Sequence, residues 1–132
     1  MSARIEGGSY EPALEPVSTV ELAGAACQQL GAEAVWVSGT GAPVTVDRVR
    51  AARAVTSLCR CALRHGGLSR VDLALDGPSL ALSPVTADVA PIIVGERVRD
   101  LGALVAGRVV DALGGSLTLE GERLVARLPP SL

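Results

Sequence analysis

The chain has 132 residues, of which 48% are apolar and 20% are charged, and its formal net charge is −2. This length and composition are typical of one globular domain and exclude a disordered chain. Basic residues gather in no stripe, so nucleic acid is not an expected partner. No apolar run approaches the roughly 20 residues that span a bilayer, and no signal core is present, so we expect a cytoplasmic protein without a membrane segment.

The first regular segment is predicted to be a helix over 18–30. Ser18 and Glu21 form a capping box, and apolar residues then recur at helical spacing until a glycine ends the run. Two short β-rich segments follow, 34–37 and 43–46, with a glycine-containing turn between them. This pattern predicts that the two segments pair as a hairpin.

A second helix is predicted over 48–65. Asp47 is a favourable N-cap, the helix carries an apolar stripe, and a pair of glycines closes it. Apolar residues then alternate over 71–75 and resume over 80–82, with an Asp-Gly-Pro turn between the two segments. We expect a second hairpin there.

The stretch 84–99 contains two prolines and no single period, so it is predicted to be a loop with one helical turn after Asp88. A third amphipathic helix is predicted over 101–113, followed by a last hairpin that joins 117–119 to 124–128. The apolar stripe of this third helix is expected to consist of Leu101, Leu104, Val105, Val109 and Ala112.

Residues 1–17 carry glycines and prolines without periodicity, which indicates a flexible N-terminal arm. The folded part is then one domain over 18–130. Hairpins outnumber crossover units in the predicted element order. The expected fold is therefore a two-layer α/β (α+β) sandwich, with a mixed, mostly antiparallel sheet and helices packed on one face.

Five reactive or aromatic residues have ordinary structural explanations. Cys27 gives the chain an odd number of cysteines, and Cys59 and Cys61 lie on an apolar helix where thiols pack well, so core packing is the expectation. His65 is the only histidine and cannot complete a metal site with these cysteines; it is expected to interact with a helix C-terminus. Trp36 is expected in the core, with a partner-binding surface as the alternative.

Residues 14–129 resemble the GHKL ATPases, and within them the catalytic and ATP-binding domain of sensor histidine kinases. The resemblance implies a Bergerat-type histidine kinase ATPase fold. It rests on the order and spacing of four stretches, which resemble the end of the family's N box, its last glycine box, its closing helix and its last strand: Leu63–Gly67, Asp100–Gly102, Asp111–Gly115 and Leu124–Pro129.

Two positions of the N box depart from that family. The family has a general-base Glu and, four residues later, a magnesium-binding Asn, where this chain has Ser57 and Cys61. A hydroxyl cannot accept a proton at neutral pH, and a thiol is too soft a ligand for magnesium. The resemblance thus implies that no residue of this N box performs the catalytic role.

The nucleotide-binding boxes depart as well. Thr86 stands nearest to the family's adenine-binding Asp, and Asp88 follows two residues later without flanking glycines. Gly102 is retained from the last glycine box, whereas Val98 and Asp100 replace glycines, and a carboxylate there would repel phosphate. No catalytic, cofactor-binding or metal-binding residue is therefore expected.

The resemblance implies a non-catalytic, histidine-kinase-like domain in two-component signalling, which has lost ATP binding and binds a protein partner such as a response regulator or a kinase. A close variant is the kinase-like C-terminal domain of histidine phosphotransferases. The alternative is an active GHKL kinase domain of the sensor-kinase or anti-sigma-factor type, which would require ATP and magnesium. A third possibility is an interaction module unrelated to two-component signalling.

The loop over 84–99 corresponds to the nucleotide lid of an active kinase. It carries four apolar side chains whose exposure to water is unfavourable by about 1.5 to 3 kcal/mol each. The hypothesis is that they pack against the second and third helices and leave no cavity of nucleotide size, a few hundred Å³. The alternative is an exposed partner-binding patch. The four residues are Val89, Ile92, Ile93 and Val94.

Overall fold

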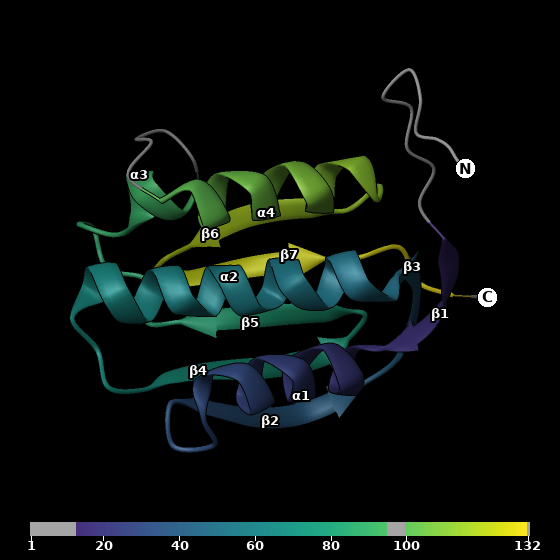
Figure 1. The fold of residues 1–132 in the computed structure, drawn as a ribbon, viewed down its shortest axis with the longest axis horizontal. Helices are drawn as coiled ribbons and strands as arrows, with labels where there is room; N and C mark the ends of the chain where they lie inside the picture. The colour runs from purple at the N-terminus through teal and green to yellow at the C-terminus, as the bar shows by residue number, and fades with distance from the viewer. Residues whose placement is uncertain (1–12, 95–99, 132) are drawn as a thin grey trace.

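A computed structural model describes residues 13–94 and 100–131, which form two layers, a five-stranded sheet and a layer of helices on one of its faces (Figure 1). In chain order the elements are β1 (Leu14–Ser18), α1 (Thr19–Leu30), β2 (Val35–Gly41), β3 (Pro43–Asp47), α2 (Arg48–Gly66), β4 (Val71–Gly77), β5 (Ser79–Ser83), α3 (Ala90–Ile93), α4 (Leu101–Ala112), β6 (Ser116–Glu120) and β7 (Arg123–Arg127). No helix among the described residues is both long and apolar enough to cross a membrane.

The large sheet has the strand order β2-β4-β5-β7-β6. β2 and β4 run parallel, and the other neighbouring pairs are antiparallel. Helices α1, α2 and α4 lie side by side over the same face (Figure 1). The predicted α/β sandwich, with a mixed and mostly antiparallel sheet and helices on one face, is confirmed.

Each long helix begins at a side-chain cap that the sequence predicts or allows. The Ser18 hydroxyl accepts a hydrogen bond from Val20 N at 3.1 Å, and the Asp47 carboxylate accepts one from Arg50 N at 3.1 Å. Asp100 caps α4 in the same way. These caps satisfy amide groups that have no partner inside the first helical turn, which is why the three predicted helices begin where expected.

The predicted hairpin between 34–37 and 43–46 is wrong. β2 pairs in parallel with β4, whereas β3 pairs with β1 in a separate two-stranded sheet. Only Ala42 separates the two strands, and its amide donates to Thr19 Oγ1 at 3.1 Å, so the chain bends at the start of α1 and leaves the large sheet. The strand β1 also shows that the irregular arm predicted over 1–17 ends sooner; residues 1–12 lie outside the described part.

Trp36 does not enter the core as predicted. Its side chain is 54% exposed, because β2 is an edge strand and Trp36 lies on the sheet face opposite to the buried Val35, away from the helices. The Arg70 guanidinium stacks over the indole ring at 4.1 Å from its centroid. The two side chains thus form a cation–π contact at the surface of the protein.

The apolar stripe predicted for the third helix is also wrong, because a different face of α4 is buried. α4 buries Ala103, Ala106 and Val110 against the core, whereas Leu101 and Val105 are 70% and 55% exposed. Small side chains allow a helix to approach its neighbours closely, so the buried face of α4 is set by packing rather than by the largest apolar residues.

The loop after β5 contains the predicted helical turn, α3. Three of its four apolar residues are buried as hypothesised, whereas Val94 is only partly buried. Val89, Ile92 and Ile93 have exposed fractions of 1%, 6% and 0%, and α3 packs against both α2 and α4. Residues 95–99 of this loop, including Val98, lie outside the described part. The partner-patch alternative for these side chains is not supported by their burial.

We expect Ile93→Ala to lower the free energy of unfolding by about 2–5 kcal/mol, because it removes a fully buried side chain and leaves a cavity. Leu101→Ala is the control, since its side chain is largely exposed and should change stability by less than about 0.5 kcal/mol. Urea unfolding of both variants measures the difference. Equal stability of the two variants would contradict the burial of α3.

A second stability prediction concerns the parallel contact of β2 with β4. Gly39 has a φ of 89°, and a Cβ there would lie 2.1 Å from the Leu75 carbonyl oxygen. Gly39→Ala should therefore destabilise the fold by at least about 2 kcal/mol. Gly24→Ala is the matched control, because α1 has open space at that position and alanine favours a helix by up to about 1 kcal/mol. Thermal unfolding of both variants should show shifts of opposite sign.

Candidate functional site

The residues singled out by the sequence divide into two groups in the structure. Ser57 and Gly102 face each other where α2 packs beside α4, and a Cβ at Gly102 would lie 3.5 Å from Ser57 Oγ. Asp100 joins them, since the same Cβ would lie 3.2 Å from its Oδ1. Cys61 lies one helical turn after Ser57 on α2, and its sulfur is close to the Asp100 carboxylate.

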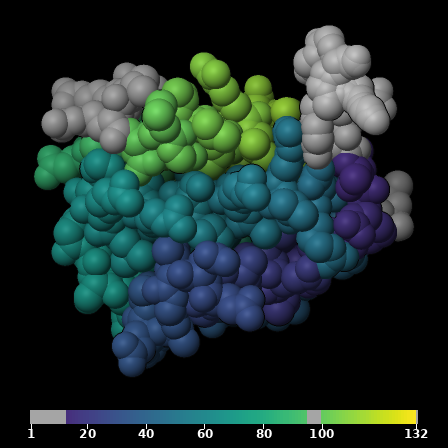
Figure 2. Space-filling model, viewed as in Figure 1, coloured from purple at the N-terminus to yellow at the C-terminus, as the bar shows by residue number. Residues whose placement is uncertain are grey.

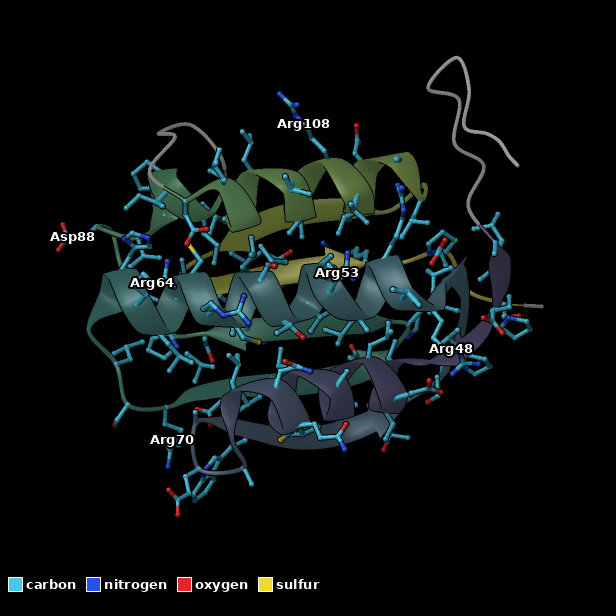
Figure 3. The ribbon with its side chains drawn as sticks, viewed as in Figure 1. Arg48, Arg53, Arg64, Arg70, Asp88 and Arg108 are labelled. Carbon is cyan, nitrogen blue, oxygen red and sulfur yellow. The ribbon has the colours of Figure 1, made fainter. Side chains whose placement is uncertain are left out.

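Thr86 and Asp88 form the other group, in the turn that leads into α3. The Thr86 carbonyl accepts hydrogen bonds from the amides of Val89 and Ala90 at 3.0 and 2.9 Å. Asp88 is exposed and points away from the rest of the molecule (Figure 3). The structure therefore does not bring Asp88 together with Ser57 or Cys61.

Asp100 is the central charged residue of the contact between α2 and α4. Its Oδ1 accepts a hydrogen bond from Ala103 N at 3.0 Å, which caps α4. Its Oδ2 lies 3.3 Å from His65 Nε2 on α2. Because the side chain is only 9% exposed, this carboxylate interacts mainly with the protein.

The Cys61 thiol is fully buried beside that carboxylate. Burial, which has the largest effect, raises the pKa of Cys61 to about 12 together with the negative charge of Asp100 and a hydrogen bond to it. The thiol is therefore protonated at neutral pH and acts as a donor to the carboxylate. Burial likewise raises the pKa of Cys59 to about 12, so the expectation that both cysteines pack in the core is confirmed.

His65 lies in the last turn of α2, where the sequence places it. Its Nε2 is buried and, within the part of the chain that the structure describes, has no hydrogen-bond partner. Asp100 Oδ2 is near enough for an electrostatic contact but not oriented as an acceptor. The sequence did not predict this cluster, because Asp100 is distant from Cys61 and His65 in the chain and only the fold brings the three together.

The resemblance implies a nucleotide with magnesium at this place, and the residues present do not fit that group. Magnesium binds hard oxygen ligands in octahedral geometry, whereas α2 offers a buried, protonated thiol. Ser57 and Gly102 are in near contact across the two helices, and Asp100 presents negative charge. Phosphate would meet repulsion here rather than the backbone amides of an open glycine loop.

A groove remains beside this contact. Its volume is about 430 Å³, so the expectation that no cavity of nucleotide size remains is wrong. The groove runs between α2 and α4. Both helices lie on the face of the molecule that Figure 2 views. It is lined by Arg50, Arg53, Ala54, Ser57, Leu101, Gly102, Val105, Ala106 and Val109.

Neither a protein-family model nor a curated protein sequence matches this chain. Solved structures do match it. The ATP-binding domain of PrrB from Mycobacterium tuberculosis superposes with a TM-score of 0.68 at 22% identity, covering 91% of this chain and 99% of the other. The mycobacterial sensor histidine kinase MprB gives a TM-score of 0.62 at 19% identity, with coverages of 89% and 99%.

The histidine kinase domain of the Escherichia coli osmosensor EnvZ is similar as well. Its TM-score is 0.61 at 18% identity, covering 95% of this chain and 92% of that one. The matches extend over nearly the whole of both chains and agree with the mixed five-stranded sheet under a layer of helices. The chain therefore has the fold of the ATP-binding domains of sensor histidine kinases.

Proposed function

We propose that this chain is a non-catalytic, histidine-kinase-like domain in two-component signalling, which has lost ATP binding and binds a protein partner. The observation that carries the proposal is the contact of α2 with α4 around Asp100. There a buried thiol at Cys61 and a hydroxyl at Ser57 stand in place of the family's magnesium ligand and general base.

The free energy of the contacts that are replaced favours the loss of nucleotide binding. A charge-assisted hydrogen bond contributes about 1.5–3 kcal/mol, and both the magnesium anchor and the adenine anchor are replaced in this chain. Their joint loss weakens binding by roughly a hundredfold or more. Asp100 adds repulsion of phosphate, since its carboxylate is 9% exposed and thus poorly screened by water.

The groove between α2 and α4 supports a role in binding protein. Leu101 and Val105 on its α4 side are 70% and 55% exposed, although both are large apolar residues. Arg50 and Arg53 line the α2 side (Figure 3 labels Arg53). An apolar surface bordered by arginines suits a partner element with apolar residues and acidic neighbours. A response regulator or a kinase is the proposed partner, because the structurally similar proteins are histidine kinases.

We expect ATP with magnesium to leave the melting temperature unchanged. Ligand binding to the native state stabilises it by RT ln(1 + [L]/Kd), and a Kd far above millimolar gives a shift below about 1 °C at about 1 mM ATP. Differential scanning fluorimetry with ATP and Mg²⁺, and with Mg²⁺ alone as control, measures this. A rise of about 3 °C or more with the nucleotide would instead support the active GHKL kinase.

Val105→Asp should weaken partner binding by at least about tenfold while leaving stability nearly unchanged, because the side chain is exposed in the groove. Val20→Asp is the matched control, since Val20 is 53% exposed on α1 and does not line the groove. Calorimetric titration with the response-regulator receiver domain encoded nearest to this chain provides the measurement. Equal affinities of both variants and the wild type would refute this groove as the binding surface.

A further inference from the structure

We propose that Cys61, His65 and Asp100 form a binding site for a transition-metal ion of the Zn²⁺ type, which links the end of α2 to the start of α4. One sulfur, one ring nitrogen and one carboxylate oxygen from these residues all lie within 4.8 Å of one another. The inference goes beyond the proposed signalling role and does not depend on it.

The three proposed ligands come from helix α2 and from the N-cap of helix α4. Cys61 and His65 are four residues apart on α2, so their side chains lie on the same helical face in successive turns. Asp100 faces them from the start of α4, where the hydrogen bond from Ala103 N holds its Oδ1 and leaves Oδ2 toward His65. Two helices therefore hold the ligand atoms close to one another before any ion arrives.

The spacing is near that of a tetrahedral zinc site. Bonds of about 2.0–2.3 Å separate the ligand atoms of such a site by about 3.3–3.8 Å. His65 Nε2 and Asp100 Oδ2 are already 3.3 Å apart, and the whole group spans no more than 4.8 Å. A change of roughly one ångström, within reach of side-chain rotation, completes the geometry.

The unsatisfied nitrogen of His65 is an independent indication of a ligand. Buried polar atoms are nearly always hydrogen-bonded, and leaving one without a partner is unfavourable. Nε2 of His65 is buried without a hydrogen-bond partner among the described residues, and it points into the cluster. A metal ion would satisfy its lone pair in the neutral imidazole form.

The donor set selects the class of ion. Sulfur with imidazole favours Zn²⁺ and its neighbours over Mg²⁺ and Ca²⁺, which require oxygen. On binding, the Cys61 thiol forms a bond from sulfur to the metal and releases its proton to solvent. The thiolate and the Asp100 carboxylate then neutralise the two charges of the ion. The partly exposed His65, with 21% of its side chain accessible, leaves a path for the ion and for a water as fourth ligand.

Titration of the apo protein with Co²⁺, followed by competition with Zn²⁺, tests the site. Cobalt bound to a thiolate gives a sulfur-to-metal charge-transfer band in the near ultraviolet, so the spectrum reports whether a cysteine is a ligand. Cys61→Ala removes the proposed sulfur, and Cys59→Ala is its matched control. Both cysteines are fully buried on α2, and each variant keeps two thiols.

The wild type and the Cys59→Ala variant should bind one ion per chain, show the charge-transfer band and melt at a higher temperature with Zn²⁺. Cys61→Ala should lose the band and bind at least about tenfold more weakly. Asp100→Asn is a second test, because asparagine also caps a helix but lacks the charged oxygen; it should weaken affinity by a similar factor. Absence of the band in the wild type, or an unchanged band in Cys61→Ala, would overturn the proposal.

Discussion

The Asp100 carboxylate connects local helix formation with the packing of the helical layer. One of its oxygens caps α4 through Ala103 N, and the other faces His65 at the end of α2. Burial raises the pKa of the Cys61 thiol, and the charge of this largely buried carboxylate raises it as well. The start of α4 and the chemistry of its contact with α2 thus both involve one carboxylate.

This arrangement explains why a histidine-kinase fold need not imply a kinase site. Fold similarity concerns the sheet and the helices over it, whereas function depends on the side chains that particular positions supply. Here the position of Gly102 still allows close approach of α4, yet Ser57 on α2 fills the facing position. The side chains beside this contact are Cys61, His65 and Asp100, a small and partly buried cluster that includes a soft sulfur ligand.

The face that α4 turns toward the core is also set by close packing. Ala103 and Ala106 face the core and let the helix lie near α2, which leaves the larger Leu101 and Val105 on the outside. Apolar residues that remain exposed beside a groove are typical of surfaces that contact another molecule. Because α4 buries the face that carries Ala103 and Ala106, it packs closely in the core and also exposes Leu101 and Val105 beside the groove. The proposal of a protein partner depends on this exposure.

The sequence by itself determined the elements whose signals are local. Caps at Ser18 and Asp47, helical periodicity, and the turns of the hairpins β4–β5 and β6–β7 act over a few residues, and the structure confirms them. Only the tertiary structure decided that β2 pairs in parallel with β4, that α4 buries its small residues, and that Asp100 meets His65 and Cys61. Those outcomes depend on contacts between segments far apart in the chain, where several pairings satisfy the same local pattern and packing of the whole core selects one.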